Sequence, residues 1–90
     1  MEKTYTQAEK ELTSNLAKTM GFEFVIFEKM YKRHPVFLAY HNELDSVLIE
    51  DDDNESEIEY LMIIVEKGNP RIVRDIDEFN EIMFWGIRYE

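Results

Sequence analysis

The apolar residues of this 90-residue chain occur in short runs, and the two longest, residues 36–40 and 61–65, contain five residues each. A membrane-spanning helix needs about 20 apolar residues in succession, so we expect no span of this kind. Short runs rich in β-branched and aromatic residues are typical of β-strands. A chain of this length builds one domain, here residues 1–90. Its first residues do not resemble a secretory signal, so we expect a soluble cytoplasmic protein.

A helix is predicted near the N-terminus. Thr6 and Glu9 have the spacing of a capping box, in which each side chain accepts a hydrogen bond from the other residue's backbone N–H. Gly21 provides a stop, because glycine adopts a left-handed conformation without steric cost. The apolar stripe at helical spacing, expected to be buried, consists of Tyr5, Ala8, Leu12, Leu16 and Met20. The opposite face, expected to be solvated, carries Lys10, Thr13, Ser14 and Lys18.

Strands are predicted in the middle of the chain, over residues 22–27, 36–41, 46–50, 58–66 and 71–74. Turns at 42–45 and 67–70 and a polar loop at 51–56 connect them. The segment 28–33 stays ambiguous, because residues 23–33 also fit a short helix that ends before Pro35.

A second helix is predicted to begin at Asp75, a favourable N-cap followed by acidic residues in the first turn. Helical spacing continues through Ile76, Phe79, Ile82, Met83 and Gly86. Residues 82–89 alternatively fit a strand whose one face carries Met83, Trp85, Ile87 and Tyr89. The order of elements predicts an α+β fold: an N-terminal helix, an antiparallel sheet of four to five strands and a C-terminal helix.

The charge of the chain is concentrated in its middle third. The chain carries 20 acidic and 10 basic side chains, a formal net charge of −10. Residues 1–33 and 67–90 are nearly neutral, at +1 and −1, whereas residues 34–66 contain ten acidic and no basic side chains. This balance weighs against direct nucleic-acid binding, which needs clustered lysine and arginine.

The acidic segment is a candidate binding face for a basic protein. Its carboxylates are Glu43, Asp45, Glu50, Asp51, Asp52, Asp53, Glu55, Glu57 and Glu59. Alternate residues of a strand lie about 6.6 Å apart on one face, and one DNA strand carries a charge about every 3.4 Å. Carboxylates on neighbouring segments would bring the charge density of this face closer to that of DNA. The face would then act as a nucleic-acid mimic. The alternative is a solvated loop that serves only solubility.

The C-terminal residues 82–85 are all large and apolar, and a helix that buries one face cannot hide all four. Trp85, together with Tyr60, is a candidate anchor for a partner, because tryptophan and tyrosine often dominate binding energy. Ile82, Phe84 and Trp85 alternatively form the seam of a homodimer, or complete the core of the monomer.

Catalytic and metal chemistry are not predicted. The chain has no cysteine, and its histidines, His34 and His41, do not have the spacing of a compact metal pair. A calcium loop beginning at Asp51 would place Ser56 and Met62 where glycine and glutamate are needed. Glycine-rich phosphate loops and serine-nucleophile elbows are also missing from the sequence. We therefore expect a protein without enzymatic activity, metal or cofactor.

In size, charge and order of elements the chain resembles the small acidic α+β inhibitors of phages and mobile elements. That class includes nucleic-acid mimics directed at Cas nucleases, restriction enzymes or uracil-DNA glycosylase. The resemblance implies an anti-CRISPR or anti-restriction type of inhibitor that engages a basic, nucleic-acid-binding protein. Two alternatives stay open: an acidic interaction or immunity-type module without mimicry, and a homodimeric structural protein.

Overall fold

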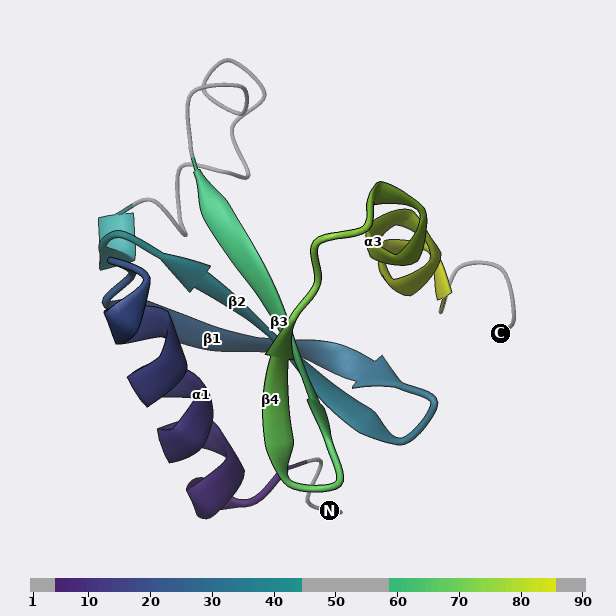
Figure 1. Cartoon of the computed structure of the whole chain (residues 1–90), viewed down its shortest axis with the longest axis horizontal. Coiled ribbons are helices and arrows are strands. Elements are labelled where there is room, and N and C mark those ends of the chain that lie inside the picture. Colours follow the sequence, from purple (N-terminus) through teal and green to yellow (C-terminus); the bar gives the residue numbers. More distant parts are fainter. Residues whose placement is uncertain (1–4, 45–58, 86–90) are drawn as a thin grey trace.

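The computed structural model describes residues 5–44 and 59–85 and has an α+β fold, as predicted. A four-stranded antiparallel sheet lies between two helices, with α1 on one side and α3 on the other (Figure 1). The elements are α1 (Gln7–Thr19), β1 (Phe24–Tyr31), β2 (His34–Tyr40), β3 (Tyr60–Glu66), β4 (Asn69–Ile72) and α3 (Ile76–Met83). The strand predicted at 46–50 and the loop predicted at 51–56 lie outside the described residues.

The strands follow one another across the sheet in chain order, β1-β2-β3-β4, and each pair is antiparallel. The two apolar runs of the sequence form the central strands, β2 and β3, whose pairing runs from Val36 opposite Ile64 to Tyr40 opposite Tyr60. Strand β2 is buried along almost its whole length, and β3 is buried over residues 62–65. Because a helix covers each face of the sheet, successive side chains can all be apolar without alternating with polar ones.

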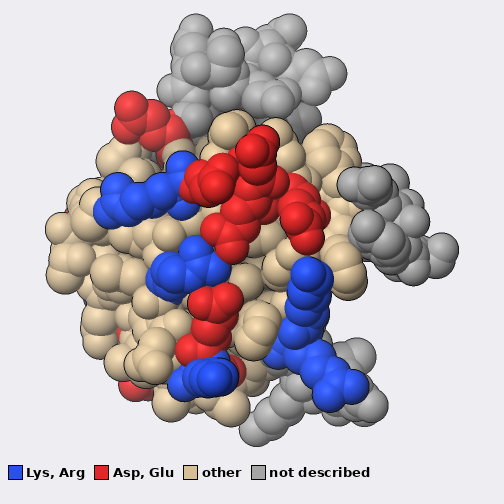
Figure 2. All heavy atoms as spheres, turned by 45° about the vertical axis from the view of Figure 1, so that its right-hand side comes forward, with Lys and Arg blue, Asp and Glu red and all other residues tan. Residues whose placement is uncertain are grey.

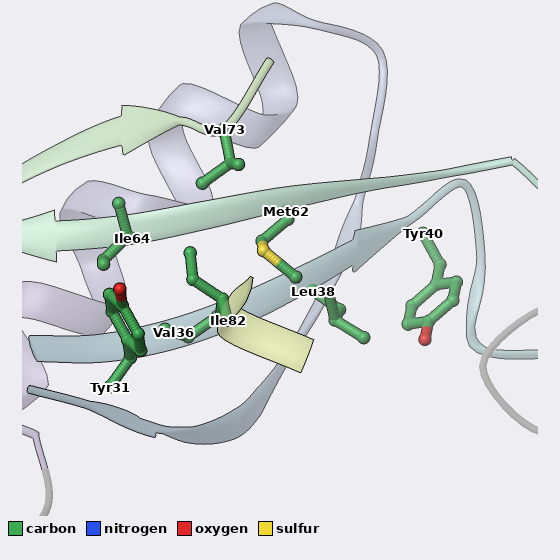
Figure 3. Close-up of a cluster of buried hydrophobic side chains, with 8 residues drawn as sticks. All are labelled: Tyr31, Val36, Leu38, Tyr40, Met62, Ile64, Val73 and Ile82. Atoms are coloured by element: carbon green, nitrogen blue, oxygen red, sulfur yellow. The ribbon is translucent and has the colours of Figure 1, made fainter. Parts of the chain in front are cut away.

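Alternate residues of the central strands feed two hydrophobic clusters, one on each face of the sheet. The cluster under α3 contains Tyr31, Val36, Leu38, Tyr40, Met62, Ile64, Val73 and Ile82. Figure 3 shows Ile82, from α3, among side chains of the strands. The cluster under α1 contains Ala17, Val25, Phe37, Ala39, Ile63 and Val65.

Helix α1 begins as predicted but buries a different face. Both capping-box hydrogen bonds between Thr6 and Glu9 are present. Thr13, predicted to be solvated, is fully buried with Ala17, whereas Leu12 and Met20 are 45% and 43% exposed. The Thr13 hydroxyl donates to the Glu9 carbonyl at 2.8 Å, so its burial leaves no unsatisfied group. The small side chains of the buried face allow the helix to lie close to the sheet.

The two ambiguous segments are resolved over the described residues. Residues 28–31 belong to strand β1, and the alternative of a helix over 23–33 is wrong. The pairing of β1 with β2 shifts register between Phe27 and Lys29, which is a β-bulge at Glu28. Residues 82–83 end helix α3, so the alternative of a strand beginning at residue 82 is wrong.

Two-residue turns connect β1 to β2 and β3 to β4, and all four of their residues have positive φ. Lys32 and Arg33 have φ of 50° and 71°, and Lys67 and Gly68 have φ of 54° and 80°. Turns of this kind match the twist of a hairpin but favour asparagine or glycine. Arg33 therefore occupies a backbone conformation that is unfavourable for a residue with a Cβ atom.

We predict that Arg33→Gly stabilises the protein by about 1 kcal/mol, because glycine relieves the left-handed strain. Gly68→Ala is the matched control and should destabilise by a similar amount. A Cβ atom at Gly68 meets nothing within 4 Å, so only backbone strain changes. Urea unfolding measures both variants, and effects of the same sign would contradict this explanation.

Lys29, on strand β1, holds the C-terminal end of α3. Its ammonium group donates to the carbonyl oxygens of Ile82 and Met83 at 2.8 and 3.0 Å. These carbonyls lie in the last turn of the helix, where the regular helical hydrogen bonds run out. A cation at this end also interacts favourably with the helix dipole. Lys29 thus fixes where α3 crosses the edge of the sheet.

We predict that Lys29→Met destabilises the protein by about 1–2 kcal/mol, through loss of the charged hydrogen bonds and of the dipole interaction. Hydrogen exchange of the amides in the last turn of α3 should accelerate more than exchange elsewhere. Lys10→Met, on α1 across the sheet, is the charge-matched control. Equal effects of the two substitutions on α3 would refute the capping role of Lys29.

Candidate interaction surface

The acidic segment is attached to one end of the sheet. Strand β2 ends at Tyr40 and β3 begins at Tyr60, and these two residues are paired. The connection over residues 41–59 therefore leaves and re-enters the sheet at the same end, which we call the acidic end. It carries nine acidic residues and no lysine or arginine. Glu43 and Glu59 are described and exposed. The other predicted carboxylates lie outside the described residues: Asp45, Glu50, Asp51, Asp52, Asp53, Glu55 and Glu57.

The opposite end of the sheet is basic. An antiparallel meander places the β1–β2 and β3–β4 turns together, at the end away from the β2–β3 connection (Figure 1). Three of the four residues in these turns, Lys32, Arg33 and Lys67, are basic, and all three are exposed. The topology thus separates charge along the sheet, which the amino-acid sequence alone did not reveal.

His41 joins three segments at the acidic end. Its Nδ1 atom lies 3.0 Å from the carbonyl oxygen of Gly21, and its Nε2 atom lies 3.2 Å from Oε1 of Glu59. The ring stacks on Phe22, with centroids 4.4 Å apart. A carbonyl and a carboxylate both accept hydrogen bonds, so only the protonated imidazolium can donate to both. No pattern in the sequence indicates this role of His41.

Helix α3 brings further carboxylates to the acidic end. The backbone N–H of Val73 donates to the Met62 carbonyl at 2.9 Å, so the chain leaves β4 towards Tyr60. Asp75 then caps α3 by accepting from the backbone N–H of Asp77 at 2.8 Å. Both aspartates are exposed. Figure 2 shows a group of acidic side chains in the upper middle of the view, with basic side chains to its left and both basic and acidic ones below. In the sequence these acids indicate only the start of a helix.

The outer face of α3 contains an open hollow of about 400 Å³, lined by Asp77, Asn80, Glu81 and Phe84. The phenyl ring of Phe84 is 53% exposed. A hydrogen bond to the β1–β2 hairpin orients Glu81. Its carboxylate accepts this bond from the Tyr31 hydroxyl at 2.5 Å. This hydrogen bond raises the pKa of Tyr31, and burial raises it further.

The residues predicted as partner anchors or as a homodimer seam differ in burial. Trp85 is partly buried and contacts Tyr31 edge to face, with ring centroids 5.1 Å apart. Tyr60 is partly buried against the cluster under α3. Ile82 is fully buried in that cluster, so its assignment to a homodimer seam is wrong. Phe84 is the member of the predicted group that is exposed.

Arg71, on β4, bridges two carboxylates beside this surface. Its guanidinium lies 3.0 Å from a Glu66 oxygen and 2.8 Å from a Glu78 oxygen. The hydrogen bonds that Arg71 donates to Glu78 and Glu66 raise the pKa of Arg71, and the bond that Glu66 accepts lowers the pKa of Glu66 below its ordinary 4.5. The network joins the β3–β4 hairpin to the first turn of α3.

We predict that Arg71→Met destabilises the protein by less than about 1 kcal/mol at neutral pH, since these side chains are about two-fifths exposed. A lowered pKa means that Glu66 contributes stability above pH 4.5, and that this contribution is lost as the pH falls through the folded-state pKa. The variant and the wild type should therefore converge in stability in acid. Urea unfolding of both proteins, from neutral pH to below pH 4.5, measures this convergence, with Arg74→Met as a charge-matched control. A difference independent of pH would contradict the role of the network.

Comparison of the chain with models of protein families, with curated proteins and with solved structures finds no match. Within residues 5–44 and 59–85, no three histidine, aspartate or glutamate side chains are grouped so as to hold a metal ion. No helix among these residues has the length and hydropathy needed to cross a membrane. The surface is therefore interpreted from its own chemistry.

Proposed function

We propose that this protein is a small acidic inhibitor that binds a basic, nucleic-acid-binding protein in place of its nucleic acid. The carboxylates of residues 43–59 would take the positions of phosphates, and no catalytic step is required. The partner class suggested by the resemblance is a Cas nuclease, a restriction enzyme or a DNA glycosylase. Such a protein would act in the cytoplasm.

The observation that carries this proposal is the separation of charge along the sheet. Nine acidic residues are attached at the end where Tyr40 pairs with Tyr60, and the basic turns are at the other end. Acids spread evenly over a surface serve solubility. Acids concentrated at one end create a directed field that orients a basic partner during encounter and raises the association rate.

The helix α3 supports the proposal independently. Asp75 and Asp77 extend the negative surface from the acidic end onto the face that also carries the exposed ring of Phe84. A binding surface that combines charge with an exposed aromatic side chain provides both steering and a short-range contact. A purely solubilising surface would not need the exposed ring.

Affinity capture tests the proposal. The immobilised chain should retain a basic nucleic-acid-binding protein from a cell lysate at low salt and release it at high salt. Replacing Asp51, Asp52 and Asp53 with asparagine should weaken retention without unfolding the chain. The control variant replaces three carboxylates away from the acidic end, Glu9, Glu11 and Glu28, with glutamine, which preserves the capping box, and should retain the partner nearly as well as the wild type.

Excess duplex DNA separates the proposal from the alternatives. A nucleic-acid mimic and duplex DNA compete for one cleft, so the DNA should displace the captured partner. Retention that DNA does not affect would instead favour an interaction module without mimicry. Unchanged retention of the aspartate-to-asparagine variant at low salt would refute the acidic segment as the binding face.

A further inference from the structure

We propose that the hollow on the outer face of α3 receives an arginine side chain of the partner. The guanidinium would stack on the ring of Phe84 and donate hydrogen bonds to Asp77, with Asn80 and Glu81 at the rim. This inference rests on the proposed function, because it identifies which group of the basic partner makes the short-range contact. It uses a different part of the chain from the acidic segment.

The lining of the hollow combines the groups that a guanidinium needs. Counted from Asp77, the other lining residues are three, four and seven positions further along the chain, so all of them lie on one face of the helix. They are Asn80, Glu81 and Phe84. The inner face, with Phe79, packs on the core cluster and cannot contribute. The outer face therefore presents an aromatic ring, two carboxylates and an amide oxygen to whatever docks there.

Phe84, the C-cap residue of α3, is 53% exposed. The Asp77 carboxylate forms no ion pair within the described part of the chain. An unpaired carboxylate beside an exposed ring is complementary to a cation that carries a flat apolar face.

The protein itself contains a filled site of the same kind beside the hollow. The Lys32 ammonium lies 3.6 Å from the Glu81 carboxylate. It also lies 5.2 Å and 5.4 Å from the ring centroids of Tyr31 and Trp85. Glu81 pairs with Lys32 and also lines the hollow. Asp77 and Phe84 likewise place a carboxylate and an aromatic ring in one site. No cation of the described residues forms an ion pair with this carboxylate.

Arginine fits this hollow better than lysine. A guanidinium is planar, so it stacks on a phenyl ring while its edge donates two hydrogen bonds to a carboxylate. An ammonium group is a hydrated point charge that cannot satisfy both contacts over the same area. A nucleic-acid-binding partner presents arginine on the surface that contacts phosphate, which is the surface that the acidic end would approach.

The test is an NMR titration of the labelled full-length chain at low ionic strength. The probes are the peptide acetyl-Gly-Arg-Gly-amide and its lysine counterpart. The arginine peptide should shift the resonances of Asp77, Asn80 and Phe84 and should half-saturate at a lower concentration than the lysine peptide. Phe84→Ala and Asp77→Asn should each raise the dissociation constant about two- to fivefold. Unchanged resonances of the core cluster show that each variant is folded.

Glu11→Gln, an exposed position on α1, is the control for removal of one carboxylate and should leave the dissociation constant unchanged. Shifts confined to Glu43, Glu59 and their neighbours would overturn the inference and leave the proposed function standing. Equal binding of the two peptides, no shift at α3, or an equal loss in Glu11→Gln would also overturn it. Failure of the proposed function is seen separately, in the lysate capture and its competition with DNA.

Discussion

The pairing of β2 with β3 is the interaction on which the rest of the structure depends. These strands are buried on both faces, so each residue of the two apolar runs contacts either the cluster under α1 or the cluster under α3. Both helices use this pair as their support. Its register, with Tyr40 opposite Tyr60, also brings the two ends of the acidic connection together. A single pairing therefore sets the core and the position of the charge.

The separation of charge follows from topology rather than from any individual residue. In a four-stranded meander the first and third connections lie at one end and the second connection lies at the other. The chain places basic residues in the first and third connections and nine acidic residues in the second. Lys29 then fixes the C-terminal end of α3, and Asp75 caps the N-terminal end near Tyr60. Asp75 and Asp77, near the start of α3, consequently extend the negative surface, whereas Glu81, near its end, pairs with Lys32 of the β1–β2 turn.

Short-range sequence patterns predicted where the helices and strands begin. Contacts between segments distant in the sequence determine which of their faces are buried and which are exposed. The capping box at Thr6 and the N-cap at Asp75 are short-range interactions, so both helix starts could be read from the sequence. The buried face of α1 could not, because small side chains at Thr13 and Ala17 suit close approach to the sheet better than Leu12 does. The contact of Lys29 with α3 joins residues more than 50 positions apart, and no local pattern indicates it. The same holds for the hollow beside Phe84, which depends on how α3 lies on the sheet.

The central claim is that a charged end of this protein guides a basic partner into place. The most direct measurement is the association rate constant with the captured partner as a function of salt concentration. If the acidic end steers the partner, the association rate constant should fall steeply with salt, and the dissociation rate constant should change much less. The association rate constant should depend less on salt once Asp51, Asp52 and Asp53 are replaced with asparagine. An association rate constant that does not change with salt would contradict the account.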